Sequence, residues 1–219
     1  SIGTKQEKTL HKFIKYYLTN DITKHEIPIN KNIIDVLINN HIYEIQTKSF
    51  NAMRNKLEVF LSDHEVTICY PMALNKTIYL TNEFGELVST KKSPKHARPL
   101  EIFIELYKIK NYLLNPNLHF KIIMLDIDEL RIKKEKTWRS RKGFERINQV
   151  PRKINHIYEI NGPDNFKDIL LEYNLKEIFT SKDFAKSTHI TIKKATVALN
   201  VLTYLTVVER IGKEKNSYL

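Results

Sequence analysis

The chain has 219 residues, 42% hydrophobic and 28% charged, which excludes an intrinsically disordered chain and suits one large or two modest folded domains. The single cysteine, Cys69, excludes a disulfide framework and a cysteine-based zinc site within one chain. The formal net charge of +11 favours a polyanionic partner, nucleic acid first and an anionic membrane second, although many basic proteins bind neither.

The sequence lacks targeting signals and several common catalytic motifs, which excludes further classes of function. The sequence contains no signal peptide and no apolar run long enough to span a bilayer, so we expect a cytoplasmic protein without a membrane partner. Glycine-rich phosphate loops, zinc-protease motifs and esterase motifs are missing from the sequence. ATPase, protease and esterase chemistries therefore lack support.

The first predicted element is a helix over residues 5–18, where apolar side chains recur at the helical period with lysines between them. Glu7 on this helix could supply a third acid to a metal site formed by the hairpin that follows. A solvated surface glutamate is the commoner role for such a residue.

Residues 33–48 are predicted as two short strands, with Asn39-Asn40 as the tight turn between them. Two acids, Asp35 and Glu44, lie inside this apolar hairpin. Burial of a carboxylate is costly unless the group is paired or binds a cation. The hairpin therefore predicts either a structural ion pair or a small site of hard oxygen ligands, which Mg²⁺ prefers.

The alternation of side chains along the second strand assigns further residues to this site. Glu44, Gln46 and Lys48 are expected on one face of the strand, because residues two apart point to the same side. Asp35 on the first strand can approach that polar face.

The middle of the chain is predicted as alternating helices and strands. The expected elements are a helix over 50–61, a strand over 66–70 that ends at Pro71, a hairpin over 77–90, a helix over 99–114 and a strand over 120–125. A helix between two strands implies an α/β sheet with a partly parallel order. Asp126, Asp128 and Glu129 follow the last strand and could add metal ligands, although an acid-rich turn is the commoner case.

The spacing of Asp35 and Glu44-Ile45-Gln46 resembles the core of the PD-(D/E)xK nuclease superfamily, whose signature is an Asp and then (Asp/Glu)-x-Lys on the next strand. The chain departs from this signature at Gln46, although some restriction endonucleases of the superfamily carry Glu-x-Gln. The resemblance implies that Asp35 and Glu44 hold Mg²⁺ or Mn²⁺, that Gln46 orients the attacking water, and that Lys48 supplies positive charge. It covers roughly residues 5–131.

Two cationic segments are candidates for contact with DNA. The loop over residues 91–99 could clamp phosphates or be a solvated linker. The segment from Arg131 to Lys153 contains ten cations and two acids, so ten minus two gives a formal charge of +8. This segment suits nucleic acid, or an arm whose Trp138 docks on the core. The candidate DNA-binding residues in the two segments are Lys91, Lys92, Lys95, Arg98, Trp138, Arg139, Arg141 and Lys142.

The C-terminal part is predicted as three helices, over 166–173, 180–186 and 190–204, followed by a hairpin of 207–211 with 216–219. This order resembles a winged helix-turn-helix domain, whose third helix enters the major groove of DNA. Lys193 and Lys194 would then contact DNA. Winged helices also serve as protein-docking or dimerisation modules, so that role stays open.

The sequence therefore predicts an α/β restriction-endonuclease-like core over 1–130, in which helices flank a mixed sheet, a basic linker or arm over 131–164 and a winged helix over 165–219. The expected function is Mg²⁺-dependent endonuclease cleavage of DNA, as in restriction or repair enzymes. The alternative is a catalytically inactive, nuclease-like DNA-binding regulator or assembly protein. A homodimer is a further expectation, because nucleases that cut both strands are often dimers.

Overall fold

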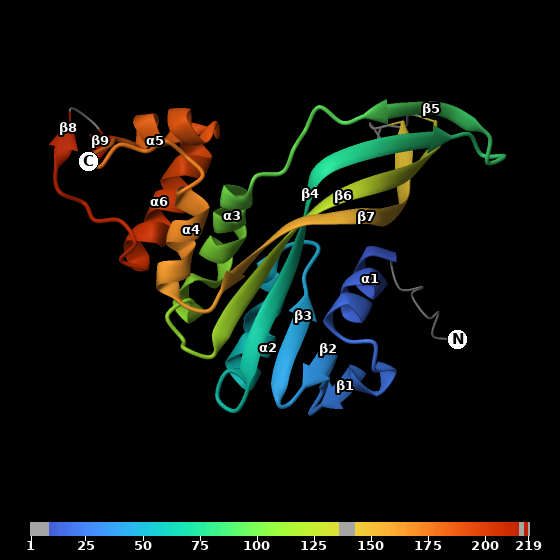
Figure 1. Ribbon diagram of the computed structural model, residues 1–219, viewed down its shortest axis with the longest axis horizontal. Coiled ribbons are helices and arrows are strands. Elements are labelled where there is room, and N and C mark those ends of the chain that lie inside the picture. Colours follow the sequence, from blue (N-terminus) through green and yellow to red (C-terminus); the bar gives the residue numbers. More distant parts are fainter. Residues whose placement is uncertain (1–8, 136–142, 215–216, 219) are drawn as a thin grey trace.

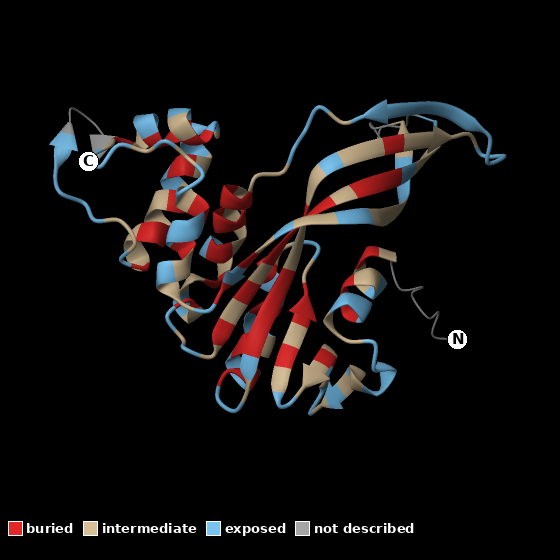
Figure 2. Ribbon diagram, viewed as in Figure 1, coloured by how far each residue is buried: buried red, intermediate tan, exposed pale blue. Residues whose placement is uncertain are grey.

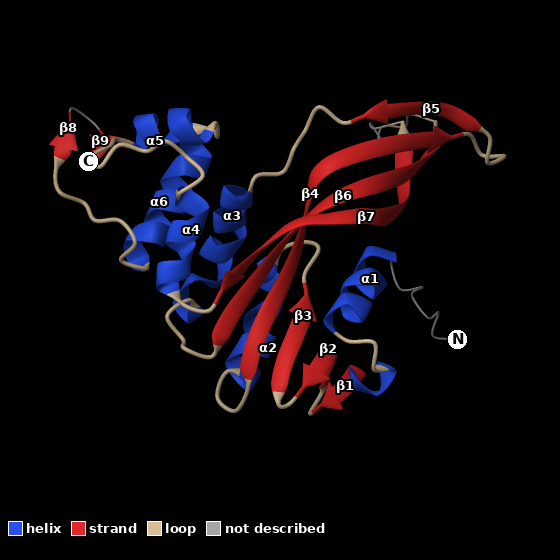
Figure 3. Ribbon diagram, in the orientation of Figure 1, coloured by secondary structure: helices blue, strands red, loops and turns tan. Residues whose placement is uncertain are grey.

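The computed structural model describes residues 9–135, 143–214 and 217–218, and Figure 1 shows their arrangement. A seven-stranded mixed sheet has the order β1-β2-β3-β4-β6-β7, and β5 pairs with β4 outside this path. Helices flank the sheet (Figure 3). The predicted α/β class with a mixed sheet is confirmed.

The N-terminal elements are α1 (Thr9–Leu18), β1 (His25–Ile29), β2 (Asn32–Ile38) and β3 (His41–Ile45). The three strands form an antiparallel meander. Asn39 and Asn40 both have positive φ angles, 48° and 66°, which a two-residue hairpin turn with this twist requires. The hairpin predicted from the Asn-Asn pair is confirmed, and β1 is a strand that the sequence did not indicate.

Two crossovers build the parallel centre of the sheet. The short helices η2 (Phe50–Met53) and α2 (Arg54–Phe60) lead to β4 (Glu65–Thr81), which runs parallel to β3. After β5 (Leu87–Lys92), the helical segments η3 (Pro99–Ile102), α3 (Phe103–Leu106) and η4 (Tyr107–Tyr112) lead to β6 (Leu118–Lys133), which runs parallel to β4. Finally, β7 (Phe144–Ile160) pairs antiparallel with β6.

The long strands correct three predictions. β4 continues through Pro71, because β3 stops pairing at Cys69 and β5 starts pairing only at Thr77, so the missing N–H of Pro71 falls between the two partners. β6 continues through the acids at 126–129, which are not in a turn. The described residues of the predicted arm at 131–164 complete β6 and form all of β7, so they are not a linker.

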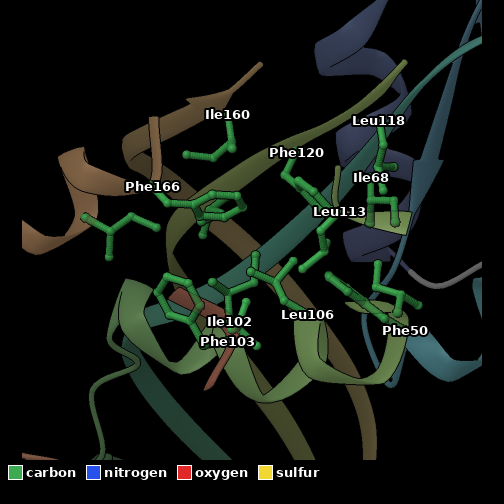
Figure 4. Packing of buried hydrophobic residues seen from close by; sticks show 14 of the residues in the cluster. Phe50, Ile68, Ile102, Phe103, Leu106, Leu113, Leu118, Phe120, Ile160 and Phe166 are labelled. Carbon is green, nitrogen blue, oxygen red and sulfur yellow. The ribbon is translucent and has the colours of Figure 1, made fainter. Parts of the chain in front are cut away.

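Two apolar clusters cover the two faces of the sheet. Figure 2 shows buried residues along the central strands and on the helices beside them. The larger one lies between the sheet and the helices of both crossovers and the C-terminal part, with Phe50, Phe103, Phe120 and Phe166 among its buried rings (Figure 4). The smaller one lies under α1. A sheet with apolar side chains on both faces needs helices on both faces, which explains the layered arrangement.

The C-terminal part contains η5 (Pro163–Asn165), α4 (Phe166–Leu170), α5 (Ser181–Thr188), α6 (Ile192–Tyr204) and a small hairpin of β8 (Lys213–Glu214) and β9 (Ser217–Tyr218). The three predicted helices are present, but residues 207–211 are not a strand. Val207 instead donates a backbone hydrogen bond to Leu202 (2.9 Å), so the chain turns back on α6. Within the described residues, no helix is long and apolar enough to cross a membrane.

Candidate active site

The candidate site lies where the β2–β3 ladder ends. The last paired residues are Val36 and Tyr43, and one step further the same register brings Asp35 opposite Glu44. The ladder of β3 with β4 continues past this point, to Ile45 and Cys69. The two acids therefore lie at the opening between β2 and β3, on a strand that β4 holds from its other edge.

At this opening the side chain of Asp35 accepts the hydrogen bond that a backbone carbonyl group would accept within a ladder. Its Oδ2 accepts a hydrogen bond from the Ile45 N–H (2.7 Å), and its Oδ1 lies 3.3 Å from Nε2 of His11 on α1. Burial alone would raise the pKa of Asp35, but hydrogen bonds from His11 and Ile45, with the charge of His11, hold it below its ordinary value. Asp35 is therefore a fixed anion at neutral pH.

Glu44 is almost completely buried, with 1% of its surface exposed. Its Oε1 accepts a hydrogen bond of 2.7 Å from Nζ of Lys56 on α2. Burial raises the pKa of Glu44 to about 7, and the neighbouring Asp35 carboxylate adds to the rise, whereas Lys56 opposes it. The site thus holds two carboxyl groups and one ammonium group, and near pH 7 both the protonated and the ionised form of Glu44 are populated.

Lys56 is anchored twice. Its Nζ also donates to the backbone carbonyl of Ile33 (2.9 Å), so α2 is tied to both strands of the hairpin. An ammonium group has three N–H donors, and the contacts with Glu44 and Ile33 use two of them. One donor is left for a further anion or for a water molecule.

Gln46 and Lys48, the other residues expected on the polar face, lie beyond the strand. β3 ends at Ile45, so the expected alternation does not reach Lys48, which is exposed in the bend that follows. The Gln46 N–H still pairs with Cys69, and its Nε2 donates to the Met53 sulfur (3.0 Å). Glu7, the expected third acid, lies outside the described residues. The lysine that contacts Glu44 is therefore Lys56 and not the predicted Lys48.

Oxygen ligands suit Mg²⁺, which usually binds through one or two carboxylates and keeps several waters. Asp35 and Glu44 fit this requirement. Among residues 9–135, 143–214 and 217–218, no group of three or more His, Cys, Asp or Glu side chains is arranged to hold a metal ion. A site at this hairpin would therefore depend on two protein carboxylates.

The expected DNA-binding residues that the structure describes lie on several separate elements. Lys91, Lys92 and Lys95 are exposed on β5 and in the loop after it. Arg98 donates to the carbonyls of Thr188 (2.9 Å) and His189 (2.5 Å) at the end of α5, so it holds the C-terminal helices in place. The expected residues Trp138, Arg139, Arg141 and Lys142 lie outside the described residues.

The two lysines predicted to enter the major groove have different surroundings. Lys193 is exposed near the start of α6. Nζ of Lys194 lies 2.5 Å from Oε1 of Glu101 in η3, so Lys194 forms an ion pair with the crossover helices. Lys193 therefore presents its charge to solvent as the sequence suggested, whereas the partly exposed Lys194 is paired with an acid.

The comparison with protein families identifies the part of the chain that contains this site. Residues 8–161 match a family described as a domain of unknown function, DUF8091. The chain belongs to the DUF8091 family. The DUF8091 domain comprises α1, the whole seven-stranded sheet and both crossovers, and so includes Asp35, Glu44 and Lys56. The C-terminal helices lie outside the matched residues.

One relative of this DUF8091 protein covers more than the matched domain. An uncharacterized protein of Treponema pallidum (strain Nichols) is 26% identical over 191 residues, which are 85% of this chain and 74% of that protein. No solved structure matches the chain. The similarity to this relative therefore includes some of the C-terminal helical part as well as the DUF8091 domain.

Sequence reasoning missed two residues of the site. His11 and Lys56 contact the acids from two different helices, α1 and α2, and only the packing of these helices on the hairpin brings them there. The available signal was weak: both are polar residues on helices predicted next to the hairpin, and neither has a spacing that distinguishes it from a surface residue.

Proposed function

We propose that this DUF8091 protein is a Mg²⁺-dependent nuclease that hydrolyses phosphodiester bonds of DNA. The observation that carries the proposal is the pair of carboxylates, Asp35 and Glu44, at the open end of the β2–β3 ladder, with the Lys56 ammonium group 2.7 Å from Glu44. Two carboxylates and one cation next to a strand end form a site that can hold a divalent metal ion and a phosphate group.

The order of the elements supports the same proposal. α1 is followed by the antiparallel strands β1, β2 and β3, then by η2 and α2, and then by β4 parallel to β3. This is the αβββαβ order of the PD-(D/E)xK superfamily, and the acids occupy β2 and β3 as the motif of that superfamily requires. The restriction-endonuclease-like core is therefore part of the proposal.

Each residue of the site has a distinct role in the proposed reaction. Asp35 and Glu44 would hold Mg²⁺ or Mn²⁺, which lowers the pKa of a bound water and neutralises charge on the scissile phosphate. Lys56 directs its remaining N–H toward a phosphate oxygen or the attacking water. The Nε2 of Gln46 is used by Met53, so its amide oxygen is the atom that would accept a hydrogen bond from the water.

A second candidate function is a nuclease-like DNA-binding protein without catalytic activity. The ion pair between Lys56 and Glu44 favours it, because this pair satisfies a buried carboxylate without a metal ion. Gln46, where the superfamily usually has Lys, also favours it. This candidate predicts salt-dependent DNA binding and no metal-dependent cleavage.

The test is incubation of the protein with supercoiled plasmid and with single-stranded DNA, in Mg²⁺, Mn²⁺ or EDTA. The Asp35→Asn variant is the matched control, because it keeps the size of the side chain and removes the charge. Metal-dependent cutting by the parent and not by the variant is the expected result. If neither protein cuts any substrate while the parent binds DNA, the nuclease proposal fails and the second candidate replaces it.

A further inference from the structure

The distal part of the sheet forms an arm beyond the candidate active site. We define the arm as residues 75–81 of β4, all of β5, residues 126–133 of β6 and residues 144–153 of β7. Figure 1 shows these strands extending past the rest of the sheet, over α1. The arm contains eight cations and four acids, so eight minus four gives a formal charge of +4.

The first turn of α1 joins this arm to the candidate site. Nδ2 of Asn148 in β7 donates to Oγ1 of Thr9 (2.7 Å), and two residues later His11 contacts Asp35. Because an α-helix rises about 1.5 Å per residue, Thr9 and His11 are separated by roughly 3 Å along the helix axis. The arm and the two acids therefore lie close to the same turn of α1, and Ile127 of the arm, two residues before Glu129 on β6, belongs to the apolar cluster under α1.

A buried carboxylate organises one face of the arm. Glu129 on β6 is 2% exposed, and its Oε1 accepts a hydrogen bond of 2.6 Å from Nε of Arg131. Its Oε2 lies 3.0 Å from Nζ of Lys76 and 4.0 Å from Nη1 of Arg146. Three cations thus converge on one carboxylate, which leaves a net charge of about +2 at this point of the surface.

The strand register shows which other cations share this face. Residues opposite each other on paired strands point to the same side of a sheet. Lys91 pairs with Ile78, which pairs with Glu129, so Lys91 lies on the Glu129 face. Lys133, four residues after Glu129 on β6, also lies there. Lys92, the next residue of β5, points to the opposite face.

The C-terminal helices offer less to an anionic partner. Lys194 of α6 is paired with Glu101, and Asn200 of α6 accepts a hydrogen bond from Lys110 (3.1 Å). The hydroxyl group of Thr188 is buried and donates to the carbonyl of Phe184. Thr188, Lys194 and Asn200 therefore make contacts within the chain, whereas Lys193 stays exposed.

We propose that the Glu129 face of the arm binds the phosphate backbone of duplex DNA and leads it to Asp35 and Glu44, and that α6 does not carry the main DNA contacts. This inference rests on the proposed nuclease function and specifies its substrate path. Glu129 is a positioning residue: it fixes Lys76 and Arg131, so that the exposed cations Lys91, Lys133 and Arg146 extend an ordered row of positive charge. Half of the Arg146 side chain is accessible to a phosphate, with 46% of its surface exposed.

The test is the affinity of the full chain for a fluorescein-labelled 20-base-pair duplex of mixed sequence, measured by fluorescence anisotropy in EDTA over a range of salt concentrations. The combined variant Lys91→Ala, Lys133→Ala and Arg146→Ala removes three exposed cations from the Glu129 face. We expect binding to weaken roughly tenfold or more, and the slope of log K against log salt to fall by about 0.9 for each phosphate that the variant no longer neutralises.

The chain offers two matched controls. Lys92→Ala removes the same charge one residue away on the opposite face, and Lys193→Ala removes an exposed lysine from α6. Both are expected to bind within about twofold of the parent, with an unchanged salt slope. Thermal melting of each variant tests whether the fold is intact, and we expect melting temperatures close to that of the parent because all these side chains are exposed.

Equal binding by the triple variant and the parent would overturn the inference, as would a loss of affinity in Lys193→Ala or Lys92→Ala as large as in the triple variant. Failure of the nuclease proposal is distinguishable, because binding is measured without metal. If the parent never cuts plasmid but the triple variant still loses affinity for DNA, the binding surface is supported and the nuclease proposal fails. If the parent cuts plasmid but the triple variant binds DNA normally, the nuclease proposal is supported and the binding role of the arm fails.

Discussion

Two buried glutamates of the same sheet have opposite electrostatic environments. Glu44 in the candidate site faces one lysine and one neighbouring carboxylate, and burial is the largest cause of the rise of its pKa to about 7. Glu129 on the arm is also penalised by burial, but hydrogen bonds from Lys76 and Arg131 and the charges of both lower its pKa below the ordinary value. Burial alone therefore does not decide the charge of a carboxylate; the number and sign of its neighbours does.

The comparison suggests different roles for the two groups. Glu129 has a surplus of cations and is neutralised without any ligand, which suits a structural anchor. Glu44 has one cation in direct contact, Lys56, and a second carboxylate beside it, and a divalent metal ion would supply the positive charge that this arrangement lacks. Substitutions at the two glutamates should therefore have different consequences.

The largest expected effect is on catalysis. Glu44→Gln keeps the shape of the side chain and removes a proposed metal ligand, so plasmid cleavage should fall by on the order of 10³-fold or more. Glu129→Gln should keep cleavage within roughly tenfold of the parent at saturating DNA, because Glu129 does not belong to the two-carboxylate site. Initial rates of cutting in Mg²⁺ measure both. Equal decreases in the two variants would remove the distinction between the two glutamates.

The next expected effect concerns stability against pH in metal-free buffer. A carboxyl group whose pKa is higher in the folded than in the unfolded protein binds more protons when folded, so it makes stability fall as pH rises. For Glu44 this fall should occur between about pH 4.5 and 7 and amount to ~3 kcal/mol. For Glu129 the sign is opposite, because its lowered pKa contributes stability that is lost as pH decreases below its ordinary value.

Urea unfolding of the parent, Glu44→Gln and Glu129→Gln across pH 4 to 8 separates these contributions. Glu44→Gln should remove the fall in stability between pH 4.5 and 7. It should leave unchanged the loss of stability at lower pH that comes from Glu129. If the stability of the parent does not decrease over this interval relative to that of Glu44→Gln, the pKa of Glu44 is not raised, and Lys56 offsets the effect of burial.

A smaller effect is expected for Lys56→Met, which keeps the aliphatic stem and removes the ammonium group. Loss of the charge that faces the phosphate should lower the cleavage rate by about 10- to 100-fold. The matched control is Lys48→Met, because Lys48 is the exposed lysine that the sequence suggested for the same role. A greater loss of activity with Lys48→Met than with Lys56→Met would restore the prediction made from the sequence.

The smallest effect is expected at the contact between α6 and the crossover helices. Lys194→Ala removes a partly exposed ion pair with Glu101, so the free energy of unfolding should decrease by less than about 1 kcal/mol. DNA affinity should stay within about twofold of that of the parent. A loss of affinity as large as that expected for the triple variant of the Glu129 face would indicate that α6 contacts DNA after all.

The parts of the structure that the sequence predicted well depend on residues close together in the chain. The Asn39-Asn40 turn fixes the register of β2 and β3, and that register brings Asp35 opposite Glu44. Local spacing was therefore enough to place the two acids. It was also enough to place the helices of the C-terminal part, where the cap at Thr180 forms as a hydrogen-bonded capping box.

The parts that the sequence could not predict depend on contacts between distant segments. Pro71 and the acids at 126–129 looked like strand ends, but the gap between the partners of β4 accommodates the proline, and cations from β4 and β7 neutralise Glu129. Lys56 reaches Glu44 only because α2 packs across the hairpin. No local pattern encodes these distances.

The pairing of β4 with β6 has a consequence for how the chain folds. This parallel ladder runs from Val66 and Leu118 to Thr81 and Ile132, so every rung joins residues about 50 positions apart. Such a ladder cannot grow from a local turn, because the intervening segment must be closed into a loop before the first rung forms. We expect refolding on a scale of milliseconds to seconds, with the arm appearing only after the crossover helices have brought β4 and β6 together.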